Sequence, residues 1–76
     1  MTRTVYVLIS CMMGQEHEVL KQVKSIPQVQ TAIITYGEYD VVAKIQAESA
    51  QQLAEIVSSQ IRQIQKIRST ITLSVI

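Results

Sequence analysis

The chain has 76 residues, which is the length of one small domain. Its formal net charge is +1, and it holds one cysteine and one histidine. The single cysteine excludes an internal disulfide, and these two ligands are too few for a closed structural zinc site. The nearly balanced charge argues against nucleic acid or a membrane as a direct partner.

Hydrophobic residues make up 47% of the chain, which is rich in Ile and Val and has no Phe or Trp. A chain of this length buries only about 60% of the surface that its unfolded form exposes. We therefore expect an obligate oligomer, which would cover the remaining apolar surface. No apolar stretch reaches the length of a membrane-spanning helix. An unpaired cysteine suits a reducing compartment, so we expect a cytoplasmic protein.

The first half of the chain predicts a strand, a helix and a second strand. Apolar residues alternate with others from Val5 to Ile9, with the period of two that is typical of a strand. Gly14 interrupts this pattern. Glu16 then begins a segment with apolar residues at helical spacing, and Pro27 ends it. A second strand follows over residues 29–35.

The second half of the chain repeats this plan, and Val23–Val29 aligns on Ile61–Ile67 with apolar residues matched. Alternation over residues 39–47 predicts a third strand. Ser49, followed three residues later by Gln52, is typical of a helix start with a capping box. The helix that it begins carries an apolar stripe. The members of that stripe are Ala50, Leu53, Ala54, Val57, Ile61 and Ile64.

A last strand over residues 70–75 completes the order βαββαβ. This order consists of two split βαβ units. With right-handed crossovers, they give the ferredoxin-like α+β fold, a four-stranded antiparallel sheet with both helices on one face. The face beneath the helices is predicted to carry Val5, Val7, Ile9, Val41, Ala43, Ile45, Ile71, Leu73 and Val75. The open face is predicted to carry Tyr6, Leu8, Asp40, Val42, Thr70 and Thr72. That face is too apolar to leave in water, so we expect a dimer joined sheet to sheet or through strand edges.

Cys11, Met12, Met13 and His17 lie close together in the sequence and could suggest a copper(I) site. Small metal carriers of this fold use two closely spaced cysteines, whereas this chain has one, so we expect no metal. Cys11 and His17 could also form a nucleophile and its base, but nothing marks an orienting group or an oxyanion hole. We therefore expect no catalysis. The basic residues are spread along the chain, and the middle strands lack the aromatic pair of an RNA-binding sheet.

The segment Tyr36-Gly37-Glu38-Tyr39-Asp40 lies between two predicted strands. Gly37 suits a tight hairpin, such as a two-residue Gly-X loop, where it takes a positive φ at no steric cost. A hairpin does not explain Asp40, because Asp is depleted in strands. Backbone N–H groups at the turn could hold a carboxylate and Asp40 could hold an ammonium. The segment is therefore either a simple turn or a receptor for a zwitterion.

The order and spacing of several motifs resemble the RAM domain, the amino-acid-sensing C-terminal module of the Lrp/AsnC transcription regulators. The first motif is Val5-Tyr6-Val7-Leu8-Ile9 followed by Gly14 and Glu16–Leu20, the second is Ile26-Pro27-Gln28-Val29, the third is Tyr36–Ala43 and the fourth is Ser69-Thr70-Ile71-Thr72. The third is similar to the family's Gly-x-Tyr/Phe-Asp loop. The resemblance covers essentially the whole chain, residues 1–76. It departs from the family at Gln28, where Gly is usual, and at Tyr36, where many members have Thr.

The resemblance implies a dimeric αβ sandwich whose dimers often assemble into rings, with an effector amino acid bound between dimers. It implies that Gly37, Glu38, Tyr39 and Asp40, with Tyr36 beside them, meet the amino and carboxylate groups of the ligand. It also implies that Thr70 and Thr72 lie near the pocket. The full-length regulators carry an N-terminal helix-turn-helix, for which this chain has no room. We therefore expect a stand-alone sensing module that acts through partners such as full-length Lrp/AsnC regulators.

Other classes of protein remain open from the sequence. Dimeric ferredoxin-like barrels also include small oxygenases and isomerases, although no histidine is predicted on the open face of this sheet. An ACT-type regulatory module has the same fold and class of ligand. A structural oligomer without a ligand is a further alternative. We expect no cofactor.

Overall fold

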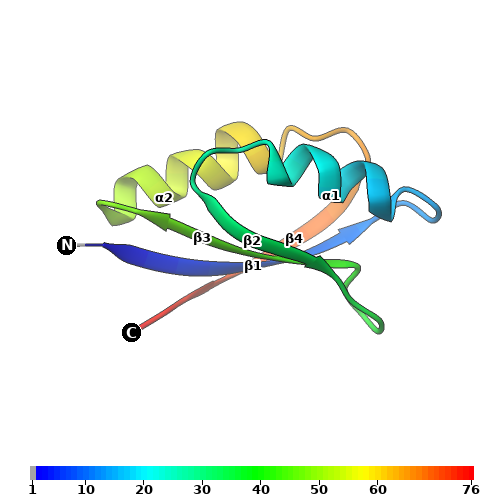
Figure 1. The fold of residues 1–76 in the computed structure, drawn as a ribbon, viewed down its shortest axis with the longest axis horizontal. Coiled ribbons are helices and arrows are strands. Elements are labelled where there is room, and N and C mark those ends of the chain that lie inside the picture. Colours follow the sequence, from blue (N-terminus) through cyan, green and yellow to red (C-terminus); the bar gives the residue numbers. More distant parts are fainter. Residues whose placement is uncertain (1) are drawn as a thin grey trace.

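Both helical segments lie on one face of a four-stranded sheet in a computed structural model that describes residues 2–76 (Figure 1). The predicted order βαββαβ and the ferredoxin-like α+β fold are confirmed. In chain order, the elements are β1 (Arg3–Cys11), α1 (Glu16–Lys24), β2 (Val29–Ile34), β3 (Val41–Ala47), α2 (Ala50–Ile56), the π-helical turn η1 (Val57–Ile61) and β4 (Ile67–Ser74).

The strands of the sheet are all antiparallel and follow the order β2-β3-β1-β4. The central strand β1 therefore pairs with β3 on one side and β4 on the other, and β2 and β4 form the two edges. Both termini lie at one end of the sheet, and the turn between β2 and β3 lies at the other end (Figure 1). Within residues 2–76, no helix has both the length and the apolar character needed to cross a membrane.

The core lies between the helices and the sheet. Val7, Ala43 and Ile45 on the sheet are fully covered, as are Val19 and Val23 on α1. The alternation in β1 and β3 thus places apolar residues beneath the helices, as predicted. Acidic residues fill the first turn of α1 and basic residues its last turn, which complements the helix dipole. The helix ends before Pro27, as expected for a residue that cannot continue it.

The start of α2 has the predicted cap. The Oγ atom of Ser49 accepts a hydrogen bond of 3.1 Å from the N–H of Gln52. The Oε1 atom of Gln52 reaches back and accepts from the N–H of Glu48 at 2.9 Å. This returning bond goes to the residue before the cap instead of to the cap itself. Two N–H groups that would otherwise be unpaired are satisfied in this way.

The second helical segment changes its winding after Ile56. The N–H of Arg62 donates to the carbonyl of Val57 at 2.9 Å, a five-residue step that defines a π-helix. Val57 and Ile61 both face the core. Ala50 and Ala54, which the predicted stripe included, are exposed. The buried stripe of this segment runs through Leu53, Ile56, Val57 and Ile61, and the two alanines lie at its margin.

The prediction for the faces of β4 is wrong. Thr72 pairs with Val7, and Leu73 pairs with Tyr6. Residues directly opposite in an antiparallel pair point to the same side of a sheet. Thr70 and Thr72 therefore lie on the helix side, and Ile71 and Leu73 lie on the open side. Hydrophobic alternation failed here because the open face is itself apolar, so an apolar row on β4 did not distinguish the two sides.

The open face carries large apolar side chains that solvent reaches. Its members, which pair across neighbouring strands, are Tyr6, Leu8, Ile33, Val42, Ile71 and Leu73. Ile33 is 57% exposed and Leu73 is 50% exposed. Contiguous apolar surface of this kind is typical of an interaction face.

Candidate functional site

The turn between β2 and β3 is wider than a two-residue hairpin. The N–H of Thr35 donates to the carbonyl of Asp40 at 2.9 Å, which closes the turn. The hydroxyl of Thr35 donates to the carbonyl of Tyr39 at 2.8 Å. Gly37 has a φ of +120°, so the predicted positive φ is confirmed. Four residues, 36–39, therefore project beyond the closing pair.

Three hydrogen bonds fix this turn to the end of β1. The N–H of Asp40 donates to the carbonyl of Ile9 at 2.8 Å. The hydroxyl of Ser10 donates to the carbonyl of Glu38 at 3.1 Å. The N–H of Cys11 donates to Oδ2 of Asp40 at 2.8 Å. The carboxylate of Asp40 thus binds a backbone N–H group at the point where β1 leaves the sheet.

This bond corrects the predicted place of Asp40. The sequence predicted that Asp40 begins a strand and points to the open face, but β3 begins one residue later, at Val41. Asp40 instead lies at the end of the sheet, where it borders one hollow with Ser10 and another with His17. Its presence next to a strand is explained by the donor that it satisfies on Cys11.

The neighbouring thiol is held in its protonated form. Burial raises the pKa of Cys11 to about 11, and the negative charges of Asp40 and Glu16 and a hydrogen bond to Asp40 act in the same direction. The thiolate is the form that attacks electrophiles and binds metals. Cys11 is therefore a poor nucleophile at neutral pH. The nearby His17 is exposed on the first turn of α1.

A hollow of about 380 Å³ lies on one side of Asp40. Its lining residues are Ser10, Cys11, Glu38, Asp40, Arg68 and Ser69. Arg68 reaches this place because of an irregularity in β4. Ser10 pairs with Ser69 and Cys11 pairs with Ile67, so Arg68 is an extra, unpaired residue. Bulges of this kind redirect a side chain and are common beside functional sites.

A second hollow of about 380 Å³ lies between the turn and the start of α1. Glu16 and His17 of the helix line it, together with Tyr36, Gly37 and Asp40 of the turn. The side chain of Tyr36 is fully exposed. Asp40 is shared by both hollows.

The structure brings together only part of the predicted site. Glu38 and Asp40 line one hollow, while Tyr36, Gly37 and Asp40 line the other. Tyr39 is half-buried beside them. Thr70 lies on the helix side, opposite Ile9. Thr72 lines a different groove, far along β4.

The predicted site did not include several polar residues that line these hollows, among them Ser10, Glu16, His17, Arg68 and Ser69. Ser10 and Ser69 carried one available signal, since both are polar residues within apolar strands. No comparable signal existed for Arg68, because its position depends on the register shift between β1 and β4.

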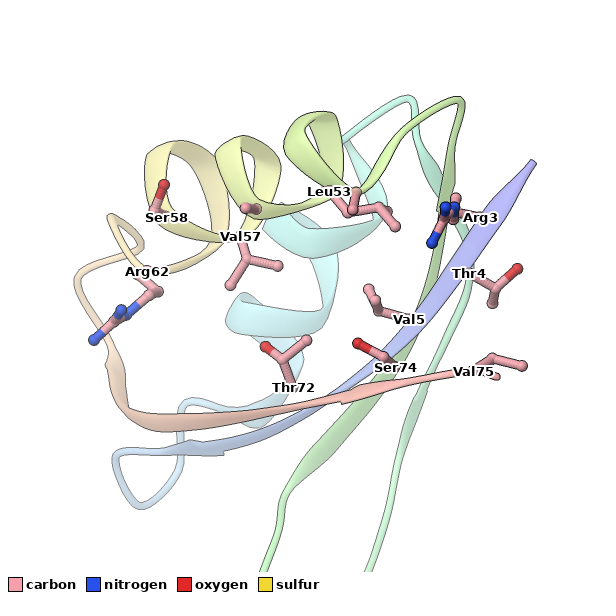
Figure 2. Close-up of a pocket in the computed structure, with 12 residues that line it drawn as sticks. Arg3, Thr4, Val5, Leu53, Val57, Ser58, Arg62, Thr72, Ser74 and Val75 are labelled. Carbon is pink, nitrogen blue, oxygen red and sulfur yellow. The ribbon is translucent and has the colours of Figure 1, made fainter. Parts of the chain in front are cut away.

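A larger hollow lies elsewhere on the described chain. It is a groove of about 470 Å³ between α2 and β4, on the helix side of the sheet (Figure 2). Arg3 and Arg62 border it, with apolar residues between them. None of the residues 36–40 contributes to it.

Comparison with known proteins shows the family to which this chain belongs. Residues 4–76 match the family model of the Lrp/AsnC ligand binding domain. An uncharacterized HTH-type transcriptional regulator of Pyrococcus furiosus is 33% identical over 58 residues, which cover 76% of this chain and 39% of that protein. The chain thus corresponds to well under half the length of this curated relative.

Solved structures agree with the family match. The crystal structure of FFRP-DM1 has a TM-score of 0.93 and 30% identity, with 97% of this chain and 99% of that chain covered. The AsnC protein of E. coli has a TM-score of 0.91 and 25% identity, with 97% of this chain and 50% of that chain covered.

The protein is therefore a regulatory ligand-binding module and not an enzyme. It belongs to the Lrp/AsnC ligand-binding domain family, and the curated relative that it matches is an HTH-type transcriptional regulator.

Proposed function

We propose that this domain binds an amino acid beside the turn of residues 36–40, at an interface between dimers, and that binding changes its assembly or its partner regulators. One observation carries the proposal: Asp40 and Arg68 line the same hollow. A free amino acid has one ammonium and one carboxylate. The carboxylate of Asp40 complements the first, and the guanidinium of Arg68 complements the second in bidentate geometry.

The hydrogen bonding of Asp40 is compatible with this role. Its Oδ2 atom accepts from the N–H of Cys11, which leaves Oδ1 for an ammonium group. Glu38 adds a second carboxylate to the same hollow. Gly37 and Tyr36 lie on the far side of the turn, where they would contact the ligand's side chain or a neighbouring subunit. Thr70 and Thr72 are not part of the proposed site.

A site between subunits fits the shape of this region. The two hollows beside Asp40 are open to solvent in a single subunit, and Tyr36 projects beyond them. The apolar open face of the sheet supports a dimer joined sheet to sheet, an αβ sandwich. A further contact between dimers would enclose the hollows and bury Tyr36.

The relatives support the kind of ligand and the kind of partner. A transcriptional regulator of Neisseria meningitidis, which shares this fold at a TM-score of 0.85 and 13% identity, was solved as a complex with L-Met. The curated relative from P. furiosus is an HTH-type regulator. We extend this to a cytoplasmic module that joins full-length Lrp/AsnC regulators in mixed oligomers.

Thermal unfolding against a panel of the common amino acids tests the proposal. A ligand present at 100 times its Kd stabilises the native state by about 2.7 kcal/mol. In a domain of this size, that corresponds to an increase in Tm on the order of 10 °C. A selective increase with one or a few amino acids would identify the effector. An unchanged Tm across the panel would contradict the proposal and favour an oligomer without a ligand.

A further inference from the structure

On β4, the groove between α2 and β4 is lined by hydroxyl side chains, whereas β1 and β3 present apolar side chains to the helices. On the helix side of the sheet, Val7 and Ala43 are buried beneath the helices, whereas Thr72 and Ser74 are exposed. The second helix packs over β1 and β3. Its nearest residues toward β4 include Ala50 and Ala54, whose small side chains do not fill the space.

The middle of this groove is apolar and its ends are cationic. Val5, Leu53 and Val57 lie between the helix and the strands, as Figure 2 shows. Arg3 lies at one end of the groove and Arg62 at the other. No described residue that lines it is acidic. A ligand that fits this pattern has an apolar body and at least one negative charge.

The position of Arg62 depends on the π-helical turn. The N–H of Arg62 bonds to the carbonyl of Val57, which widens the helix where it borders the groove. Turns of this type are frequent at functional sites. Of the residues of β4 labelled in Figure 2, Thr72 lies nearer to Arg62 than Ser74 does, and both Arg62 and Thr72 line the groove. The end of the groove at Arg62 therefore offers a guanidinium and a hydroxyl, which are suitable donors for a carboxylate.

The dimensions of the groove suit an elongated molecule. A helix rises about 1.5 Å per residue, so the wall from Ala50 to Arg62 is on the order of 18 Å long. The volume of about 470 Å³ lies within the range of small-molecule pockets. A free amino acid would contact only a fraction of such a groove.

We propose that this groove binds an elongated apolar carboxylate, with its head group at Arg62 and Thr72 and its body along Val57, Leu53 and Val5. The site is distinct from the one at Asp40, with which it shares no lining residue. The domain thus has a second ligand site, independent of the proposed amino-acid effector.

A two-dimensional NMR titration with decanoate tests this site, with 1-decanol as the neutral control. Decanoate is expected to shift the amide signals of residues 50–62 and 72–75 and to bind at least tenfold more tightly than decanol. Arg62→Gln is expected to weaken decanoate binding about tenfold, the loss of one charge-assisted hydrogen bond. Lys24→Gln removes the same charge from exposed α1 and is expected to leave the affinity unchanged.

Ala54→Glu provides a second variant that is expected to fold normally. Ala54 is exposed on α2, where Glu is a good helix former, but the new carboxylate would lie in the groove. It is expected to abolish decanoate binding and leave the oligomeric state unchanged. The proposal is wrong if decanol binds as tightly as decanoate, if Lys24→Gln weakens binding as much as Arg62→Gln, or if no localised shifts occur. Dissociation of the oligomer by Ala54→Glu would show instead that a second copy fills the groove.

Discussion

The carboxylate of Asp40 accepts a hydrogen bond of 2.8 Å from the backbone N–H of Cys11, 29 residues earlier in the chain. This bond connects the turn between β2 and β3 to the end of the central strand. It gives Asp40 a structural role in a single subunit, in addition to its proposed role in ligand binding. Two substitutions at this position can separate these roles.

Asp40→Asn is expected to preserve the fold and remove ligand binding. The amide oxygen of Asn can still accept from the N–H of Cys11, but the negative charge for an ammonium group is lost. Asp40→Ala removes both, and is expected to lower the free energy of unfolding by about 1–3 kcal/mol. Urea unfolding measures stability, and calorimetric titration with the effector measures affinity. Equal, undiminished affinity in both variants would exclude Asp40 from the site.

Arg68→Gln is expected to weaken binding of the effector amino acid at least tenfold, because a charged hydrogen bond to its carboxylate is lost. The amide derivative of the same amino acid lacks that carboxylate and should bind more weakly than the free amino acid. Its affinity should be similar for the variant and for the natural protein. Lys66→Gln removes an equal charge from an exposed position two residues away and serves as the control. If the amide and the free amino acid bind equally well to the natural protein, Arg68 has no such role.

Gly37→Ala is expected to lower the free energy of unfolding by about 1–3 kcal/mol. The φ of +120° at this residue is outside the region that residues with a Cβ atom adopt readily. No atom of another residue lies within 4 Å of a Cβ built there, so the cost comes from backbone strain and not from a clash. Gly37→Asn and Gly14→Asn form a matched pair. Gly14 has a φ of +80°, closer to the left-handed region that Asn tolerates. Gly14→Asn should therefore lower the free energy of unfolding less than Gly37→Asn does.

The stability of the protein is expected to fall as the pH rises above about 9. The pKa of Cys11 is raised from 9.0 to about 11 by burial first and by Asp40 second. Between these values the folded protein holds the proton while the unfolded chain releases it, so increasing pH favours unfolding. Cys11→Val removes this contribution, and comparison of the two proteins by urea unfolding from pH 7 to 10.5 isolates it from other groups. Parallel pH profiles would contradict the assignment.

Leu73→Asp is expected to dissociate the oligomer. Leu73 is half-exposed on the open face of the sheet, where a new charge would be desolvated by a packed partner. Sedimentation equilibrium at micromolar concentration measures the change in mass. Gln51→Asp adds the same charge to exposed α2 and should leave the mass unchanged. A Leu73→Asp protein that keeps its full mass would place the subunit contact on another surface.

Most of the fold could be predicted from the sequence because its signals are local. The alternation in β1 and the cap at Ser49 each depend on residues that are close in the chain. The π-helical turn at Val57 was not predictable in this way, since one extra residue per turn hardly disturbs an apolar stripe. The side that β4 presents was not predictable either, because apolar residues are suitable on both sides of this sheet.

The candidate site was predictable only where one segment forms it. Gly37 carried a clear signal of positive φ, and Asp40 stood out as an unusual residue next to a strand. The approach of Arg68 depends on a bulge in strand pairing, which joins segments that are distant in the sequence. The prediction for the side of the sheet on which Thr72 lies was wrong because that side also depends on pairing between distant segments. The side chain of Thr72 follows the register with β1, which no short motif encodes.

The reversed orientation of β4 has a consequence for how substitutions along this strand should behave. Ile71 and Leu73 belong to the open face, while Thr72 and Ser74 border the groove beneath α2. Changes at Ile71 and Leu73 should therefore alter the mass of the oligomer, and changes at Thr72 and Ser74 should alter ligand binding in the groove. A scan of residues 71–74 would show phenotypes that alternate from each residue to the next.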